Sequence, residues 1–275
     1  MRLLHIVVCV KQVPDTTEVR VDPETNTLIR EGVPSIINPY DAHAVEAAVS
    51  LKEKYGGKVT VISMGPPQAE EVMRRSIAIG ADEGILLSDR NFAGSDTLAT
   101  SYILAQGIQR VSDKEPVDLV LCGKQAIDGD TAQVGPGIAV RLNIPQLTYV
   151  MEIEEVDLES KEIIVHRKLE DKKVRVACRF PALLTVVRDI NEIRYSSLPD
   201  LIKSARYKPK LWTQKELGLD LQQIGLKGSP TSVSKIFAPP QRSEGEIIPG
   251  GQDNPNEAAK VLVQKLLSTK IIANK

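Results

Sequence analysis

Residues 118–136 read DLVLCGKQAIDGDTAQVGP, and this stretch joins an apolar run to a helical pattern through a loop of small and acidic residues. A buried strand that leads through glycine to the start of a helix is the commonest way in which an α/β protein binds a nucleotide phosphate. The stretch therefore predicts an α/β fold and a candidate phosphate site. None of the usual nucleotide fingerprints fits it.

The same alternation of apolar runs and helical patterns fills the first half of the chain. We expect strands at residues 3–10, 58–64, 84–87 and 117–122, and helices at residues 39–55, 68–79, 96–112 and 131–142. Continuous apolar runs are typical of parallel strands that are buried on both faces. Residues 19–30 indicate a small hairpin between the first strand and the first helix. The pattern predicts a doubly wound, mostly parallel sheet.

The second half of the chain is organised differently. Residues 150–156, 162–169, 173–179 and 182–187 are strand-like segments between charged turns, which predict antiparallel hairpins within residues 147–188. Between residues 225 and 256 there is almost no periodicity, and an amphipathic helix is expected at residues 257–272. We therefore expect an α/β domain at 1–190, a loop and helix at 191–210, and an extended C-terminal arm and helix at 211–275.

Composition excludes several classes of partner. The chain of 275 residues has 35 basic and 36 acidic residues, so no electrostatic footprint for nucleic acid or a membrane surface is present. Residues 1–10 lack the features of a signal peptide or membrane span, which predicts a cytoplasmic protein.

Cys9, Cys122 and Cys178 are widely spaced, which favours free thiols over a disulfide or metal site. No histidine or cysteine pair has metal-ligand spacing, and no side chain is required as a catalytic nucleophile or acid.

Two phosphate-binding motifs are excluded by the residues around the glycines. Gly123-Lys124 is followed by Gln125 and has no glycine at the spacing of a P-loop. The first strand is followed by Lys11 rather than by the glycine-rich turn of a Rossmann fold. Backbone amides at the start of the following helix remain as candidate diphosphate donors. These are the amides of Thr131, Ala132, Gln133 and Val134.

The acidic residues of this loop need roles that do not repel a phosphate. We expect Asp130 to cap the helix that follows and Asp128 to serve the loop or ribose hydroxyls. Gly123 is expected where the backbone passes close to a ligand. In the alternative interpretation, Gly129 and Asp130 merely form a tight turn before a capped helix.

A second group of residues is expected at the same edge of the sheet. Cys9, Met64 and Gly123 end three strands, and ligands of doubly wound sheets lie beyond the carboxyl ends of strands where the strand order reverses. Asn38 and Asp41 begin a helix that would lie close by and hydrogen-bond a ribose or an adenine edge. The alternatives are that Asn38 is a plain helix cap and Met64 a plain core residue.

Several motifs together resemble the β subunit of electron transfer flavoproteins over nearly the whole chain. They are VKQVP (10–14), INPYD (37–41), AVEAA (44–48), MGP (64–66), GAD (80–82), GKQAID (123–128) and NEIRYSSLP (191–199). The resemblance implies a nucleotide-binding domain of the adenine-nucleotide α-hydrolase-like type. It also implies that a nucleotide is bound by Cys9, Asn38, Tyr40, Asp41, Met64, Gly123, Gln125, Asp128, Gly129, Asp130, Thr131, Ala132, Gln133 and Val134.

The identity of the nucleotide divides this family. Housekeeping members hold a structural AMP, whereas residues 128–136 and 88–101 look like the electron-bifurcating members, whose β subunit holds FAD. By this resemblance Thr97 and Thr100 lie near the flavin and its diphosphate. Simple capping of their helix by Asp96 is the alternative. An unrelated ATP-binding enzyme is a further alternative, although its phosphate-activating loop is not found.

The resemblance also implies a mechanism and partners. NADH gives a hydride to FAD in this chain, and one electron then passes through an FAD of the α subunit to a dehydrogenase, such as an acyl-CoA dehydrogenase. The other electron goes to ferredoxin. Residues 194–200 correspond to the loop that docks on the dehydrogenase, with Leu198 as an apolar anchor beside Tyr195. A helix start capped by Ser196 or Ser197 is the alternative for this loop, and the C-terminal arm packs on the α subunit.

Overall fold

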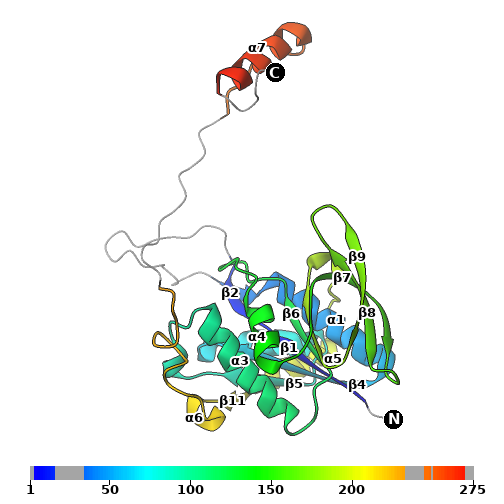
Figure 1. Ribbon diagram of the computed structural model, residues 1–275, viewed down its shortest axis with the longest axis vertical. Helices are drawn as coiled ribbons and strands as arrows, with labels where there is room; N and C mark the ends of the chain where they lie inside the picture. The colour runs from blue at the N-terminus through cyan, green and yellow to red at the C-terminus, as the bar shows by residue number, and fades with distance from the viewer. Residues whose placement is uncertain (1–2, 16–33, 233–244, 249, 270–275) are drawn as a thin grey trace. The chain divides into compact units, whose positions relative to one another are not determined.

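The computed structural model describes residues 3–15, 34–232, 245–248 and 250–269 (Figure 1). Its strands are β1 (Leu4–Cys9), β2 (Gln12–Pro14), β3 (Ser35–Ile37), β4 (Gly57–Met64), β5 (Glu83–Leu87), β6 (Leu119–Gly123), β7 (Gln146–Asp157), β8 (Glu162–Lys168), β9 (Lys173–Arg179), β10 (Ala182–Val186) and β11 (Lys210–Trp212). Its α-helices are α1 (Pro39–Tyr55), α2 (Glu70–Ile79), α3 (Thr97–Ser112), α4 (Val134–Leu142), α5 (Leu198–Arg206), α6 (Gln214–Leu217) and α7 (Pro255–Ser268), and short 3-10 helices are η1 (Pro67–Ala69), η2 (Arg90–Phe92) and η3 (Arg188–Ile190). The hairpin expected at residues 19–30 lies outside the described residues.

The main sheet has the strand order β11-β5-β4-β1-β6-β10-β7-β8-β9, and neighbours from β11 to β7 run parallel. From β1 the chain adds β4 and β5 on one side, and it then crosses to the other side to form β6. The strand order therefore reverses between β1 and β6, where Cys9 pairs with Cys122. The predicted doubly wound, mostly parallel α/β fold is confirmed. Its expected ligand edge lies beyond the carboxyl ends of these two strands.

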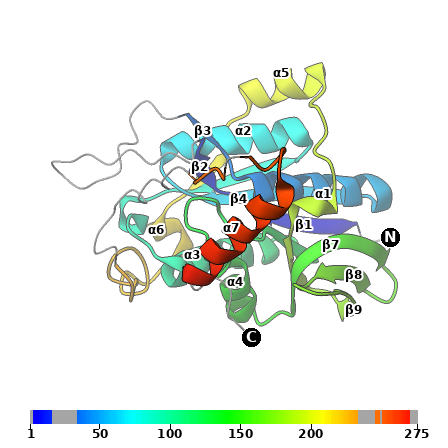
Figure 2. The ribbon, with the colours of Figure 1, turned by 90° about the horizontal axis from the view of Figure 1, so that it is seen from above.

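Side chains of β1 alternate between two hydrophobic cores. Ile6 and Val8 pack with α1 and α2, whereas Val7 and Cys9 pack with α3 and α4 on the opposite face (Figure 2). Every residue of β1 is buried. Each valine or isoleucine buried in this way contributes about 1.5–3 kcal/mol to folding. Helices on both faces explain why the strand needs an unbroken apolar sequence.

The antiparallel extension of the sheet is built from β7, β8 and β9. These strands pair antiparallel in chain order, as expected. β10, which we expected in the same hairpins, instead runs parallel between β6 and β7. All residues of β10 are buried, whereas those of β9 alternate between exposed and half-buried. An unbroken apolar run is typical of an internal parallel strand, so this signal was present in the sequence.

The segment after residue 190 continues to pack with the sheet. α5 lies against α2 (Figure 2), and β11 pairs parallel with β5. The chain forms two compact units, Met1–Ile236 and Phe237–Lys275, and α7 belongs to the second. Packing therefore continues well past the boundary expected at residue 190. The separate roles expected for residues 191–210 and 211–275 stay predictions.

Candidate functional site

One buried carboxyl group ties the first turn of α1 to the ends of β1 and β6. Oδ2 of Asp41 accepts a hydrogen bond of 2.8 Å from the Lys11 amide, and Oδ1 accepts one of 3.1 Å from the Gly123 amide. Asp41 is only 6% exposed. The structure thus brings the helix start to the point where the strand order reverses, as the sequence predicted.

Burial dominates the titration of this group. It raises the pKa of Asp41 to about 7, and hydrogen bonds that involve Asn38, Lys11 and Gly123 oppose this change only in part. The carboxyl group therefore exchanges between its neutral and charged forms near neutral pH. A neutral carboxyl group can also donate a hydrogen bond, and it does not repel an anionic ligand at this edge.

Gly123 is explained by the packing of α1. A Cβ atom at this position would lie 2.3 Å from Oδ1 of Asp41 and 2.6 Å from Cβ of Tyr40. Neither neighbour can give way unless the first turn of α1 moves away from β6. The close neighbour of Gly123 in the structure is thus α1, and the expected approach of its backbone to a ligand stays a prediction.

Asn38 fixes the loop that follows β6. Its Nδ2 donates to the Gln125 carbonyl at 2.9 Å, and its Oδ1 accepts from the Ile127 amide at 3.2 Å. The residue occupies the N-cap position of α1, but its side chain makes no capping hydrogen bond. The capping role expected for Asn38 is therefore wrong, because the loop takes both polar atoms of the side chain.

Two further contacts close this loop. Nζ of Lys11 lies 2.7 Å from both carboxylate oxygens of Asp128, and Asp130 accepts a hydrogen bond from Nε2 of Gln125. Asp128 thus serves the loop, which is one of the two roles expected for it. Gly129 lies in the exposed turn between the two acidic residues. Because both carboxylates have protein partners, they repel a nearby phosphate less than free carboxylates would.

The helix after this loop begins later than expected. α4 starts at Val134 rather than at Thr131, and its N-cap position is Gln133, which makes no side-chain cap. Asp130 and Ala132 both have φ of 55°, in the left-handed region. This conformation cannot continue into a right-handed helix. The expectation that Asp130 caps α4 is therefore wrong.

Pro136 gives the physical reason for the late start. In a helix that began at Thr131, Pro136 would lack the amide that the Ala132 carbonyl needs, and its ring would clash with that turn. From the observed start, Pro136 lies in the first turn, where no intrahelical amide is needed. The helix-terminal donors are consequently the amides of Val134 and Gly135. Those of residues 131–133 belong to the loop instead.

The first turn of α3 lies beside the start of α4. Asp96 caps α3 by accepting hydrogen bonds from two first-turn amides at 2.9 and 3.1 Å, which confirms the capping alternative. Oγ1 of Thr97 donates to Oε1 of Gln133 at 3.1 Å. Thr100 is half-buried in the next turn of α3. Two helix N-termini, each favourable to anions, therefore meet at the same edge as Asp41.

The ends of the central strands contain sulfur and hydroxyl groups. The hydrogen bond with Cys9, together with burial, raises the pKa of the Cys122 thiol. Met64 is half-buried against the core on the α3 side. Ser63 is fully buried, and its Oγ has no hydrogen-bond partner in the described part of the chain. An unpaired buried hydroxyl costs about 1–3 kcal/mol, so Ser63 marks a place where a ligand or water would complete the site.

A cavity of about 710 Å³ opens beside this edge. Tyr40, which the sequence predicted as cofactor-binding, lines the cavity together with Lys124. The guanidinium group of Arg188 lies 4.9 Å from the Tyr40 ring centre, and Nζ of Lys124 lies 5.3 Å from that of Tyr149. The cavity wall thus combines aromatic rings with cationic groups.

The residues predicted to bind a partner lie on the surface around α5. Tyr195 is fully exposed and Leu198 is 70% exposed. Ser197 caps α5 by accepting a hydrogen bond from the Asp200 amide at 3.3 Å, as one alternative predicted. We define the α5 surface as the exposed apolar side chains of Tyr195, Leu198, Leu201 and Ile202. Capping and exposure are compatible, because the cap leaves this surface free.

The polar groups beyond the carboxyl ends of the central strands fit a nucleotide diphosphate. Helix amides at the start of α4, the hydroxyls of α3 and the unpaired Oγ of Ser63 are neutral donors. Within residues 3–15, 34–232, 245–248 and 250–269, we find no group of three or more histidine, cysteine, aspartate or glutamate side chains that could hold a metal ion. In the same ranges, none of the helices has the length and apolar character needed to cross a bilayer.

The sequence analysis did not predict two residues of this edge, Lys11 and Ser63. Lys11 lies two residues beyond the end of β1, and its position close to a strand end was the available signal for the contact with Asp128. Ser63 is the penultimate residue of β4, but an isolated serine in an apolar run gives no sign that its hydroxyl lacks a partner. Side-chain pairing across the sheet edge depends on strand order, which local sequence does not state.

Comparisons with known proteins agree with this architecture. Residues 25–210 match the electron transfer flavoprotein domain. The chain is 51% identical over 267 residues to protein FixA of Azotobacter vinelandii, covering 96% of this chain and 95% of that protein. It is 50% identical over 270 residues to the caffeyl-CoA reductase-Etf complex subunit CarD of Acetobacterium woodii, covering 98% and 100%. It is 48% identical over 273 residues to the electron transfer flavoprotein subunit beta of Megasphaera elsdenii, covering 98% and 100%.

Proposed function

The chain belongs to the electron transfer flavoprotein family, as a β-type subunit, and we propose that it is the β subunit of an electron-bifurcating member that holds FAD. In this proposal it forms a heterodimer with an α subunit, which holds a second FAD. With both flavins bound, the heterodimer takes a hydride from NADH and sends one electron to a dehydrogenase and the other to ferredoxin, and the flavins supply this chemistry.

The observation that carries the proposal is the length of the polar edge. It runs from Asn38 and Asp41 at the start of α1, through the loop after β6, to Thr97 at the start of α3. AMP needs only the part of this edge around α1 and the loop. The hydroxyl groups of Thr97 and Thr100 at the start of α3 provide polar groups where the remaining half of a dinucleotide would lie, once the Thr97 hydroxyl is released from Gln133, and this supports FAD over AMP.

The protein contributes binding and orientation in this proposal. Asn38 holds the loop in place, and the amides of Val134 and Gly135 face the diphosphate with the positive end of the α4 dipole behind them. Asp41 can carry a proton near neutral pH, which removes a negative charge close to the diphosphate. Ser63 would gain the partner that its Oγ lacks in the described chain.

The proposed partners would bind surfaces outside this edge. We propose that the α5 surface docks on the electron-accepting dehydrogenase, for example an acyl-CoA dehydrogenase, through Tyr195 and Leu198. An apolar side chain that is 70% exposed, as Leu198 is, supports this role because large exposed apolar groups often anchor interfaces. The segment 211–275 is proposed to pack on the α subunit. We place the heterodimer in the cytoplasm.

Counting the cofactors tests the proposal. The chain is co-produced with its α partner, and the nucleotides released on denaturation are separated and quantified. We expect two FAD per heterodimer and bleaching of the flavin absorbance on addition of NADH. One FAD and one AMP per heterodimer would instead identify a non-bifurcating β subunit with structural AMP, and this result would overturn the proposal.

A further inference from the structure

The segment that precedes the α5 surface is bound to α1 at two places. Nδ1 of His43 and Oδ1 of Asn191 lie 2.8 Å apart, and Nδ2 of Asn191 donates to the His43 carbonyl at 3.0 Å. The second attachment is made by Arg194. Because α1 begins at the candidate nucleotide site, one helix supports both that site and the segment leading to α5.

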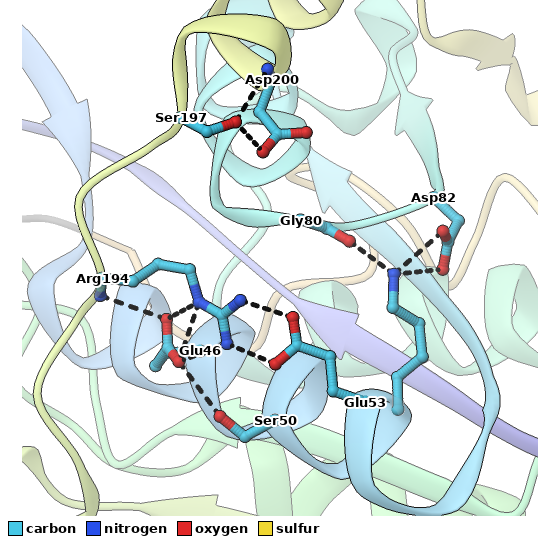
Figure 3. A network of polar contacts seen from close by, with 9 residues as sticks. Glu46, Ser50, Glu53, Gly80, Asp82, Arg194, Ser197 and Asp200 are labelled. Atoms are coloured by element: carbon cyan, nitrogen blue, oxygen red, sulfur yellow. Dashed lines mark hydrogen bonds and ion pairs between the residues drawn. The ribbon is translucent and has the colours of Figure 1, made fainter.

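Arg194 joins two carboxylates of α1 (Figure 3). Its guanidinium group donates to both oxygens of Glu46 at 2.9–3.1 Å, and to both oxygens of Glu53 at 2.6 and 2.9 Å. The backbone amide of Arg194 donates to Glu46 as well, at 3.2 Å. Both the main chain and the side chain at position 194 are thereby fixed to α1.

The two carboxylates differ in burial, and Glu46 is the anchor. Glu46 is 4% exposed and accepts a further hydrogen bond of 3.0 Å from Oγ of Ser50. A buried carboxylate without a cation is costly, so it strongly favours a conformation that keeps Arg194 beside it. Glu53 is mostly exposed, and the Arg194 hydrogen bonds lower the pKa of its carboxyl group.

The exposed residues follow this anchor directly. Tyr195 is the next residue, and Leu198 opens α5. The far end of α5 is held too, because Oη of Tyr207 accepts a hydrogen bond of 2.6 Å from the Gly84 amide. α5 packs against α2 and is held by hydrogen bonds near both of its ends, and of these two attachments only Arg194 lies next to Tyr195.

We propose that Arg194 is a positioning residue for docking: clamped by Glu46 and Glu53, it presents Tyr195 and Leu198 in a fixed arrangement before a partner arrives. The inference rests on the proposed docking function of the α5 surface. Its partner presents an apolar pocket with an acidic rim, because Lys203 and Arg206 lie on the same helix as the apolar side chains. Ordering this segment only on binding would weaken the complex, since fixing flexible residues costs conformational entropy.

The test uses the full heterodimer and an acyl-CoA dehydrogenase as the probe. Arg194→Gln removes the clamp, and Arg75→Gln is the matched control, because Arg75 is an exposed arginine of α2 away from this network. Leu198→Ala removes a proposed contact and leaves the clamp intact. Glu53→Gln loosens Arg194 without leaving Glu46 unpaired, which provides a second variant if Arg194→Gln folds poorly.

Two readouts separate positioning from contact. In the free heterodimer we expect Arg194→Gln to speed hydrogen exchange of the backbone amide at position 194, which donates to Glu46 at 3.2 Å, at least about tenfold. We also expect it to raise the KM for the dehydrogenase about tenfold at unchanged kcat. Glu53→Gln should produce smaller changes in the same direction. Leu198→Ala should raise the KM without altering exchange of the amide at position 194, and Arg75→Gln should alter neither.

The outcomes distinguish the inference from the function on which it rests. If Leu198→Ala weakens docking but Arg194→Gln changes neither exchange nor KM, the positioning role is wrong and the docking function stands. If the unaltered heterodimer does not dock, or Leu198→Ala docks normally, the proposed docking function is overturned. Faster exchange in Arg194→Gln with an unchanged KM would also overturn the inference, because a preformed segment would then be irrelevant to binding.

Discussion

Asp41 and Glu46 are buried carboxyl groups on the same helix, and their surroundings differ in kind. The first turn of α1 holds Asp41 with backbone amides of Lys11 and Gly123. The middle of α1 holds Glu46 with the guanidinium group of Arg194. Burial is nearly equal, at 6% and 4%.

The difference shows how one helix serves two purposes. Amides of two strand ends cannot fully offset burial, so Asp41 titrates near neutral pH at the edge where a nucleotide is proposed. A guanidinium group, in contrast, stays charged and keeps its partner fixed over the whole physiological pH range. The first arrangement suits a site that must accept anionic phosphates, and the second suits a rigid surface.

The largest predicted effect breaks the contact of α1 with β6. Gly123→Ala places a methyl group 2.3 Å from Oδ1 of Asp41, so α1 must move, and we expect a loss of about 3 kcal/mol or more in the free energy of unfolding. Gly129→Ala is the control, because a Cβ there meets nothing within 4 Å, and it should stay within about 0.5 kcal/mol. Urea titration measures both. Equal stability of the two variants would contradict the packing role of Gly123.

The next prediction concerns the titration of Asp41. Its folded pKa of about 7 lies above its ordinary value of 3.8, so between these values the folded state retains a proton that the unfolded state releases. The free energy of unfolding should therefore fall as pH rises, by about 2 kcal/mol between pH 5 and pH 7. Asp41→Asn cannot titrate, so subtracting its pH profile isolates this effect. Parallel profiles for the two proteins would show that Asp41 does not titrate in this range.

The contribution of the buried Glu46 carboxylate is tested by removing its charge. Glu46→Gln weakens several charge-assisted hydrogen bonds with Arg194, and we expect a loss of about 1.5 kcal/mol. The matched change Glu53→Gln affects an exposed partner of the same guanidinium group and should cost less than about 0.5 kcal/mol. Chemical denaturation compares the two. Similar losses would mean that burial does not distinguish these carboxylates.

The smallest predicted effect concerns Thr97, which lies at the end of the polar edge opposite to Asp41. Thr97→Val removes the hydroxyl group that contacts Gln133, and if FAD spans the edge its affinity should fall about threefold to tenfold. Binding of AMP should not change. Flavin fluorescence titration of the apo heterodimer measures the effect, with Thr269→Val, at the C-cap of α7, as the control. An unchanged FAD affinity would place the flavin away from α3.

Much of the fold was predictable because its signals are local. Apolar runs predicted β1, β4 and β6, and the ends of α1 and α2 at Gly56 and Gly80 were expected as observed. The start of α4 was not, because a Gly-Asp turn before a helical pattern looks like a cap unless Pro136 is weighed against it. β10 was misassigned because it follows two antiparallel strands, although its own unbroken apolar run favours a parallel position.

The candidate site could likewise be predicted only in part from the sequence. Asn38, Asp41 and Gly123 were expected together because strand ends of a doubly wound sheet share one edge. Their partners were not predictable. The sequence indicated a helix cap at Asn38, but its side chain bonds the loop after β6 instead. A side chain bonds whichever backbone groups tertiary packing brings within reach.

The sequence by itself determined the strand and helix types, the doubly wound class and the edge at which polar groups gather. These follow from hydrophobic period and chain punctuation, which act over a few residues. The tertiary structure alone decided which carboxyl group meets an amide and which meets a guanidinium group. Asp41 and Glu46 look equivalent along the chain. Asp41 meets Gly123, and Glu46 meets Arg194, only because long-range packing brings residues from distant parts of the sequence against α1.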